Sequence, residues 1–378
     1  MKIAFFSNFL NHHQIPLSNE LAKILGDNYT FVSCQPMSQE REAMGWKLNQ
    51  EYGYELKAYA SFKNYKKAMQ LADESDIVII GSADENYIKE RLKQKKITFR
   101  YSERYFKKGK WRLVDPRVFL SHYKRDFRHR HNKNLFMLCA SSYTAPDCKF
   151  IFSYPNRMFK WGYFTSVKEH DISGLMTGKK NSQCNILWCA RLIKLKNPQK
   201  PIQVLKRLAE KGYDVNMEII GGGVLEQRLK QMAQEYGLDK KVTFCGPLRP
   251  QEVIEHMEKA NIFLFTSNKQ EGWGAVLNES MSSGCAVVAN RTIGSVPFLI
   301  KEGWNGFTYR NTTEGLYKQV ERLVQNRELC NTLGVNAYQT MRDVWSPRNA
   351  ARRLVEFCCD LLNGRIKDFE DGPMSRAK

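Results

Sequence analysis

Short apolar runs alternate with amphipathic segments along the first half of the chain. Five of these runs predict strands, at residues 2–7, 30–34, 75–82, 97–103 and 134–142. The run SDIVIIGS at 75–82 is apolar almost throughout, which is typical of a strand buried on both faces of a parallel sheet. Helical spacing in 17–25 and 115–131 predicts helices between the strands. The alternation therefore indicates a doubly wound α/β sheet.

The pattern loosens and then begins again in the second half. A polar stretch rich in Gly, Ser and Lys, residues 173–183, is the predicted linker. Beyond it we predict strands at 184–190, 215–223, 242–246, 261–267 and 285–290, and helices at 198–211, 224–236, 250–259 and from about 275. An amphipathic segment at 347–362 predicts a last helix. The expected architecture is two Rossmann-like α/β domains that face each other across a ligand-binding cleft.

The expected boundaries follow from this pattern. We predict an N-terminal domain of residues 1–172, to which a C-terminal helix at about 345–378 returns, and a second domain of residues 180–344. A length of 378 residues suits two domains, and the content of 42% hydrophobic and 26% charged residues is that of a folded soluble protein.

Composition also limits the compartment. The ten cysteines include no C-x-x-C pair, which favours free thiols in a reducing environment. The start, MKIAFFSNFL, lacks the pattern of a secretion signal, and no apolar run is long enough to span a bilayer. We therefore expect a cytoplasmic protein.

The net charge of +20 is concentrated in one segment. Residues 89–133 carry seventeen Lys and Arg against four Asp and Glu, interleaved with aromatic residues. Such a segment predicts a face that attracts anionic lipid on the inner side of a membrane. A solvated basic face remains the alternative, with Phe119, Tyr123 and Phe127 as a helix core stripe. No nucleic-acid-binding module is recognised, so no specific nucleic acid is expected.

The stretch EGWGAVLNESMSSGCAVVA (271–289) carries the clearest chemistry. Two carboxylates, Glu271 and Glu279, lie eight residues apart on either side of a predicted helix start. Backbone amides at such a start bind phosphate, and ionised carboxylates grip vicinal hydroxyls. The residues expected to offer those amides are Gly272, Trp273, Gly274 and Ala275. A nucleotide sugar has a diphosphate between two hydroxyl-rich ends, so it matches this arrangement.

The same stretch resembles the E-x7-E signature of the retaining GT-B glycosyltransferases, most closely glycosyltransferase family 4. Four further elements resemble that family in the same order: ARLIKLKNP (190–198), IIGGG (219–223), VTFCGPL (242–248) and GWNGF (303–307). The resemblance implies that Glu279 holds the ribose, that Glu271 contacts the donor sugar, and that Arg191 and Lys196 neutralise the diphosphate. It also implies donor contacts at Gly222, Gly246 and Pro247.

The first domain departs from the family pattern. The loop SNFLNHHQIP (7–16) lacks the family's Gly-Gly pair, so His12 and His13 are assigned to the acceptor side. Glu103 stands where the family often has a histidine. It either positions the sugar or acceptor, or forms a salt bridge with a nearby arginine. Lys160 or Gly162 is expected to face the cleft, with Lys160 assigned to the acceptor side, whereas Trp161 and Tyr163 either stack on a sugar or belong to the core.

These features predict a metal-independent retaining hexosyltransferase without a cofactor. The expected donor is a UDP-sugar, and the expected acceptor is a saccharide or lipid-linked saccharide in cell-surface polysaccharide biosynthesis. No D-x-D motif ends a predicted strand, which is the reason to expect no metal. The alternatives are another GT-B enzyme, such as an epimerase or phosphorylase, and a basic membrane- or nucleic-acid-binding protein. A nicotinamide dehydrogenase is disfavoured because no G-x-G-x-x-G opens the first helix.

Overall fold

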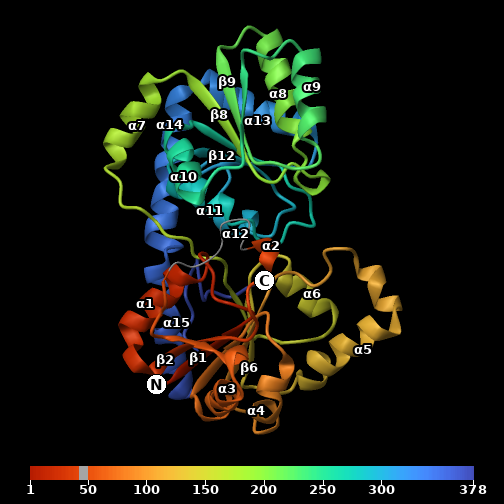
Figure 1. Cartoon of the computed structure of the whole chain (residues 1–378), viewed down its shortest axis with the longest axis vertical. Coiled ribbons are helices and arrows are strands. Elements are labelled where there is room, and N and C mark those ends of the chain that lie inside the picture. The colour runs from red at the N-terminus through yellow and green to blue at the C-terminus, as the bar shows by residue number, and fades with distance from the viewer. Residues whose placement is uncertain (42–49) are drawn as a thin grey trace. The chain divides into compact units, whose positions relative to one another are not determined.

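The computed structural model describes residues 1–41 and 50–378 and divides the chain into two compact units (Figure 1). Unit 1 consists of Met1–Ser166 together with Ser346–Lys378, and unit 2 consists of Val167–Trp345. Each unit contains one parallel sheet with helices around it, as the alternation of apolar and amphipathic segments predicts.

Unit 1 is built on a seven-stranded parallel sheet in the order β3-β2-β1-β4-β5-β6-β7. Its strands are β1 (Ile3–Ser7), β2 (Tyr29–Ser33), β3 (Glu55–Lys57), β4 (Ile77–Ile80), β5 (Thr98–Ser102), β6 (Leu135–Cys139) and β7 (Met158–Lys160). Every residue of β1, β4 and β6 is buried, because helices cover both faces of a parallel sheet. The carboxyl ends of β1, β4 and β5 open into the loops that line a cavity.

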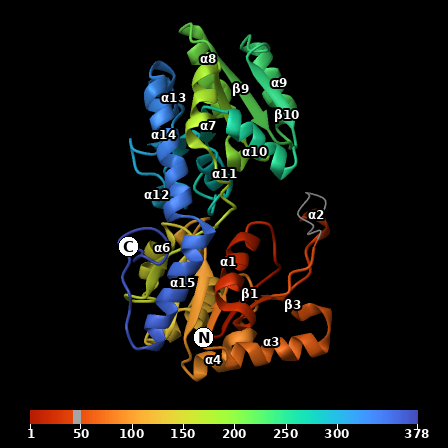
Figure 2. The same cartoon turned by 90° about the vertical axis from the view of Figure 1, so that its left-hand side faces the viewer.

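The helices of unit 1 include one from the end of the chain. They are α1 (Ile15–Leu25), α2 (Gln39–Arg41), α3 (Phe62–Glu74), α4 (Lys89–Lys93), α5 (Pro116–Arg125), α6 (Thr144–Phe150) and α15 (Pro347–Leu362). Helix α15 lies against α1 (Figure 2). Its Phe357 ring packs edge-on to Phe159 of β7 at 4.6 Å. The expectation that the C-terminal helix returns to the first domain is therefore confirmed.

Helix α5, in the basic segment, is not part of the core. None of its residues is buried, and Phe119 and Tyr123 are 56% and 44% exposed. The interpretation of Phe119 and Tyr123 as a core stripe is therefore wrong. The helix is held instead by polar contacts just beyond its end, where the buried Asp126 accepts hydrogen bonds from Tyr105 and Tyr154.

Unit 2 repeats the design with a six-stranded parallel sheet in the order β10-β9-β8-β11-β12-β13. Its strands are β8 (Cys184–Cys189), β9 (Val215–Ile220), β10 (Val242–Gly246), β11 (Ile262–Phe265), β12 (Ala286–Asn290) and β13 (Phe307–Tyr309). Its helices are α7 (Ile172–Asn181), α8 (Gln199–Glu210), α9 (Glu226–Glu235), α10 (Pro250–Lys259), α11 (Val276–Ser282), α12 (Val296–Leu299), α13 (Thr313–Gln325) and α14 (Arg327–Gln339).

The predicted linker at 173–183 is wrong, because most of it forms helix α7 within unit 2. The polar composition hides two buried positions. Met176 is buried, and so is Lys179, whose Nζ donates to the carbonyl oxygens of Met257 at 3.0 Å and Ala260 at 2.6 Å. A lysine whose ammonium group donates hydrogen bonds to backbone carbonyls can pack in the core, although the sequence alone predicts an exposed side chain.

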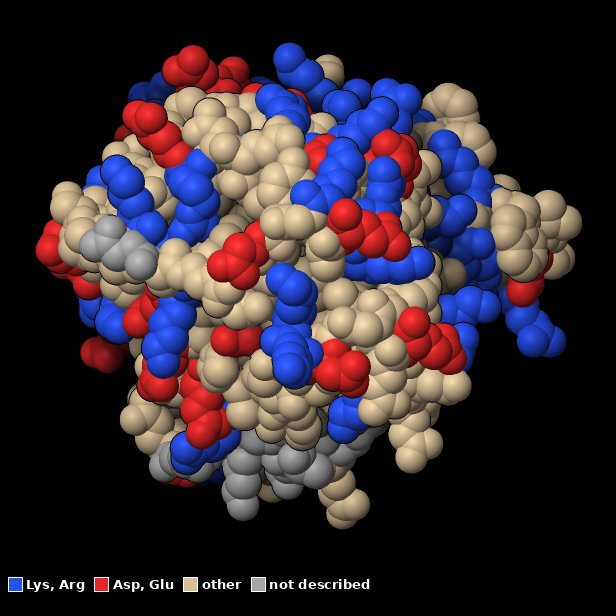
Figure 3. Space-filling view, turned by 90° about the horizontal axis from the view of Figure 1, so that it is seen from above, with Lys and Arg blue, Asp and Glu red and all other residues tan. Residues whose placement is uncertain are grey.

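The surface carries the excess of 59 Lys and Arg over 39 Asp and Glu. On the face seen in Figure 3, side chains of the two signs are interspersed. All ten cysteines are free thiols, as expected from their spacing. Within residues 1–41 and 50–378, the structure contains no helix that is both long and apolar enough to cross a membrane.

Two helical glycines of unit 2 make a matched test of this packing. A Cβ added at Gly334 of α14 would lie 2.4 Å from the carbonyl oxygen of Gly284, whereas one at Gly178 of α7 meets no atom within 4 Å. We expect Gly334→Ala to destabilise unit 2 by about 1–3 kcal/mol through overpacking. Gly178→Ala should stabilise it by about 0.5–1 kcal/mol through helix propensity. Urea unfolding followed by circular dichroism measures both, and changes of the same sign would contradict the packing.

Candidate functional site

Two glycines after β9 position the loop that carries Arg191. Gly221 and Gly223 have φ angles of +128° and +152°, which favour glycine. A Cβ on Gly221 would lie 2.0 Å from the carbonyl oxygen of Ala190, and one on Gly223 would lie 2.7 Å from that of Leu192. The backbones therefore touch, and this contact presents Arg191 as an exposed side chain at the carboxyl end of β8.

Gly222, which lies between Gly221 and Gly223, has a different role. A Cβ at Gly222 would have Pro247 Cδ as its nearest neighbour, at 3.7 Å, which is an ordinary van der Waals contact and not a clash. Gly246 ends β10, and its carbonyl oxygen accepts a hydrogen bond from the Gly221 amide at 2.8 Å. The structure thus brings together Gly222, Gly246 and Pro247, which the resemblance assigns to the donor.

Lys196 lies in a single 3-10 turn, Lys194–Lys196, that is tied to the end of β11. Thr266 Oγ1 donates to the Lys196 carbonyl oxygen at 2.7 Å and accepts from Trp188 Nε1 at 2.8 Å. From this anchored turn the Lys196 ammonium forms an ion pair with the Glu271 carboxylate. Each side chain is only 14% exposed. Lys196, expected at the diphosphate, and Glu271, expected at the donor sugar, are therefore in direct contact.

The loop between Glu271 and α11 is held by a buried indole. The Trp273 side chain lies in the core, donates from Nε1 to Asn278 Oδ1 at 2.8 Å and packs against Trp345. Gly274 has a φ of +78°, and a Cβ there would lie 2.3 Å from the Phe265 ring. Trp273 can therefore meet a ligand only through its backbone, as the predicted amide cradle requires.

Glu279 differs from Glu271 because its carboxylate has no cationic partner in residues 1–41 and 50–378. It lies in the first turn of α11, and burial raises its pKa to about 7. Among the described residues no group donates a hydrogen bond to this carboxylate. Glu279 is half-buried, and a carboxylate that is partly withdrawn from water suits a ligand that supplies hydroxyl groups.

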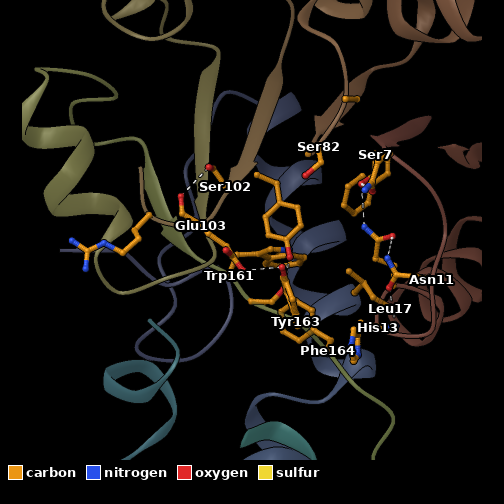
Figure 4. Close-up of a pocket in the computed structure, with 18 of the residues that line it drawn as sticks. Ser7, Asn11, His13, Leu17, Ser82, Ser102, Glu103, Trp161, Tyr163 and Phe164 are labelled. Carbon is orange, nitrogen blue, oxygen red and sulfur yellow. Dashed lines mark hydrogen bonds between the residues drawn. The ribbon is translucent and has the colours of Figure 1, made fainter. Parts of the chain in front are cut away.

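Unit 1 contains a separate cavity of about 570 Å³ at the carboxyl ends of β1, β4 and β5 (Figure 4). Glu103 and Tyr163 lie on its wall, and the Tyr163 hydroxyl donates to Glu103 Oε1 at 2.9 Å. The other Glu103 oxygen is in a salt bridge with Lys107. Glu103 therefore lines a cavity and is ion-paired at once, with a lysine as its partner instead of an arginine.

The two histidines of the first loop are placed differently. Their rings lie 3.9 Å apart, but only His13 lines the cavity. Burial, helped by the neighbouring His12 and Arg41, lowers the pKa of His13 to about 3. The His13 ring is therefore neutral near pH 7 and can offer hydrogen bonds to an acceptor but no positive charge.

Lys160 is not brought to the cavity wall. Its Nζ donates to Asp371 Oδ1 at 2.8 Å, which ties β7 to the end of the chain. Trp161 is buried and packs on Phe164 at 4.7 Å, so its indole is a core group. Lys160 belongs to the strand that supports the cavity, whereas Trp161, Gly162, Tyr163 and Phe164 line it.

Sequence reasoning missed the amide and hydroxyl groups of the same wall. Gln14 Nε2 donates to Ser7 Oγ at 3.2 Å, and Asn11 Nδ2 donates to Gln14 Oε1 at 3.1 Å. All three residues line the cavity. The available signal was the polar loop directly after a buried strand, which is where ligands bind in parallel sheets.

The comparisons with known proteins find similarity in unit 2. Residues 177–340 match the family model of the glycosyl transferases group 1. An uncharacterised glycosyltransferase of Methanocaldococcus jannaschii is 31% identical over 140 residues, which are 37% of this chain and 39% of that protein. The D-inositol 3-phosphate glycosyltransferase of Corynebacterium glutamicum is 29% identical over 127 residues, 32% of this chain and 30% of that protein. These alignments span less than half the length of either relative.

The fold of the whole chain has solved counterparts. The structure of Anabaena HepE in complex with UDP is similar with a TM-score of 0.68 and 16% identity, and the match covers 97% of this chain and 100% of HepE. The chain has the GT-B fold of two Rossmann-like domains, and residues 177–340 of its C-terminal unit are similar to the group 1 glycosyl transferases.

The raised pKa of Glu279 makes a test of its environment. The pKa of Glu279 is about 7 in the folded protein, against an ordinary value of 4.5 in the unfolded chain. Between these two pH values the folded protein binds the Glu279 proton more tightly than the unfolded chain does. Ionisation therefore costs stability as the pH rises through that window. We expect Glu279→Gln to raise the free energy of unfolding by about 1–3 kcal/mol at pH 8, and by much less at pH 5. Urea unfolding at both pH values measures this.

The control for this prediction is Glu255→Gln, which neutralises an exposed glutamate of unit 2. It should change stability little and equally at the two pH values. An equal effect of Glu279→Gln at pH 5 and pH 8 would mean that the Glu279 carboxylate is not desolvated.

Proposed function

We propose that the protein transfers a hexosyl residue from a UDP-sugar, with retention of configuration, to a saccharide or lipid-linked saccharide. We place this reaction in cell-surface polysaccharide biosynthesis. The observation that carries the proposal is the pairing of Lys196 with Glu271 in a domain that matches the group 1 glycosyl transferases and also presents Glu279, which has no cationic partner in the described part of the chain.

In the proposed donor complex the ion pair opens. The Lys196 ammonium turns to the diphosphate, because the diphosphate carries more negative charge than one carboxylate. Glu271 then becomes free to accept hydrogen bonds from the sugar hydroxyls. Arg191, which is exposed at the end of β8, adds a second cation to the diphosphate. The half-buried Glu279 carboxylate then accepts hydrogen bonds from the ribose hydroxyls. The preference for uridine is supported by HepE, whose structures include complexes with UDP and with UDP-glucose.

The proposed chemistry needs no side-chain nucleophile. As the bond to the diphosphate breaks, an oxocarbenium-like centre forms and the acceptor hydroxyl attacks from the same face. The acceptor proton goes to the departing phosphate oxygen. Catalysis is then positioning together with charge stabilisation by Arg191 and Lys196, with neither metal nor cofactor.

We assign the cavity of unit 1 to the acceptor. Its volume of about 570 Å³ lies within the range of small-molecule sites. Hydroxyl, amide and carboxylate groups of Ser7, Asn11, Gln14 and Glu103 line it, and such groups hydrogen-bond to saccharide hydroxyls. The neutral His13 ring adds one more uncharged partner.

The two cations give the central test. We expect Arg191→Ala and Lys196→Ala each to lower kcat by about 10²–10³, the effect of losing one group that stabilises the leaving charge. Lys194→Ala removes a neighbouring exposed lysine of the same turn and should leave kcat within about twofold. Release of UDP from a panel of UDP-sugars, with and without a saccharide acceptor, measures the rates.

Two results would contradict the proposal. Near-normal rates in both Arg191→Ala and Lys196→Ala would remove their role, provided that Lys194→Ala is also normal. Conversion of the nucleotide sugar into an epimeric nucleotide sugar, without acceptor and without net release of UDP, would instead indicate an epimerase. A thermal-shift comparison of UDP, GDP and ADP tests the choice of base.

A second proposal concerns the basic segment. We propose that residues 89–133 dock the enzyme on the anionic inner face of a membrane, because α5 exposes Phe119, Leu120 and Tyr123 among Lys and Arg residues. Apolar side chains enter the interface while each nearby cation contributes about 1 kcal/mol of attraction. This docking would bring the enzyme to lipid-linked acceptors.

Vesicle flotation tests the docking. The wild-type protein should float with vesicles containing acidic lipid and not with neutral vesicles, and high salt should release it. The double variant Phe119→Ser/Tyr123→Ser should float at least about tenfold less. Phe62→Ser/Tyr65→Ser, which removes two exposed aromatics of α3 outside the segment, should float normally. Equal flotation of the two double variants would exclude α5 as the docking element.

A further inference from the structure

Unit 2 contains a cluster of three side chains of different chemistry, and none of them is among the residues assigned to the donor. They are Glu218 of β9, Cys245 of β10 and His256 of α10, and their potential ligand atoms all lie within 4.8 Å of one another. All three are half-buried. His256 Nδ1 lies 2.7 Å from Glu218 Oε2, so two members of the group are already in contact.

An irregularity in the sheet aims the cysteine at this group. In the pairing of β10 with β9, Phe244 lies opposite Ile219 and Gly246 lies opposite Ile220, so Cys245 is an extra residue at a bulge. A bulge redirects the side chain that it contains. The thiol therefore joins Glu218 and His256.

The carboxylate of Glu218 is also held from behind. Asn185 of β8 donates from Nδ2 to Glu218 Oε1 at 3.0 Å, while the other oxygen faces His256. An outer partner that orients one oxygen of a ligand is typical of metal sites. The Asn185 Oδ1 atom is itself buried without a hydrogen-bond partner among the described residues.

We propose that Glu218, Cys245 and His256 form a Zn²⁺ site with three protein ligands and a water molecule in the fourth position. Thiolate, imidazole and carboxylate are the ligands that Zn²⁺ takes in proteins. Tetrahedral coordination separates such ligand atoms by about 3.3–3.6 Å. Small side-chain rotations reach this geometry from the observed spacing, with His256 and Glu218 moving slightly apart to admit the ion.

The site would join three elements that are far apart in sequence. Strands β9 and β10 are neighbours in the sheet, and α10 would be fixed to both by the metal. Cys245 directly precedes Gly246 and Pro247, so the ion would also rigidify that strand end. This inference goes beyond the proposed function and does not depend on it, because the test reads metal binding and not transfer.

Cobalt and zinc titrations of the full chain test the site. We expect one Co²⁺ per chain, with the near-ultraviolet charge-transfer band of a thiolate ligand, and displacement of Co²⁺ by Zn²⁺. Cys245→Ser should abolish the band and weaken Zn²⁺ binding by more than about 100-fold. Asn185→Ala should keep the band and weaken binding by about 10–100-fold, the effect of losing an outer partner. Zn²⁺ should raise the Tm of the wild type but not of Cys245→Ser.

Controls separate this site from the nine other cysteines and from misfolding. Cys359→Ser, which removes an exposed thiol of α15, should bind Co²⁺ as the wild type does. Glu218→Gln keeps the shape of the cluster and should weaken Zn²⁺ binding while the metal-free Tm stays near that of the wild type. The proposal is overturned if no saturable binding occurs, or if Cys245→Ser binds Co²⁺ with an unchanged band.

Discussion

The ion pair between Lys196 and Glu271 is the interaction around which unit 2 arranges its chemistry. Both side chains are largely withdrawn from water. A pair in such a position adds little to stability, because desolvation offsets most of the attraction. The ion pair keeps a cation and a carboxylate close together at the site, and each neutralises the charge of the other. The supporting contacts, from Thr266 and Trp188 to the close backbones at Gly221 and Gly223, hold the turn that carries the cation.

Glu271 and Glu279 are the same residue type in different environments. Glu271 forms an ion pair with a lysine, whereas half-buried Glu279 has no cationic partner among the described residues, and desolvation raises its pKa to about 7. Two acids in such different surroundings are suited to different partners. The first suits exchange between a lysine and a ligand, and the second suits hydroxyl donors. Unit 1 contrasts with this, because its cavity is lined mainly by hydrogen-bonding groups whose charges are already paired.

Much of the fold could be predicted from the sequence because burial on both faces of a parallel sheet leaves continuous apolar runs. Strands such as β4 and β12 stand out for that reason, and so does the Glu pair beside its glycines. Short strands such as β7 and β13, with three residues each, carry too little pattern to be recognised. Helix α7 was mistaken for a linker because its buried Lys179 is satisfied by carbonyl groups contributed by a distant helix end.

Local pattern therefore determined the class of fold, the order of its elements and the residue types that can grip a nucleotide sugar. Tertiary structure decided which of those residues meet. Lys196 and Glu271 are 75 positions apart, and Glu218, Cys245 and His256 come from three separate elements. Their contacts depend on strand order and on a bulge in one ladder. Neither is encoded in the spacing of neighbouring residues, because pairing between strands is set by the packing of the whole sheet.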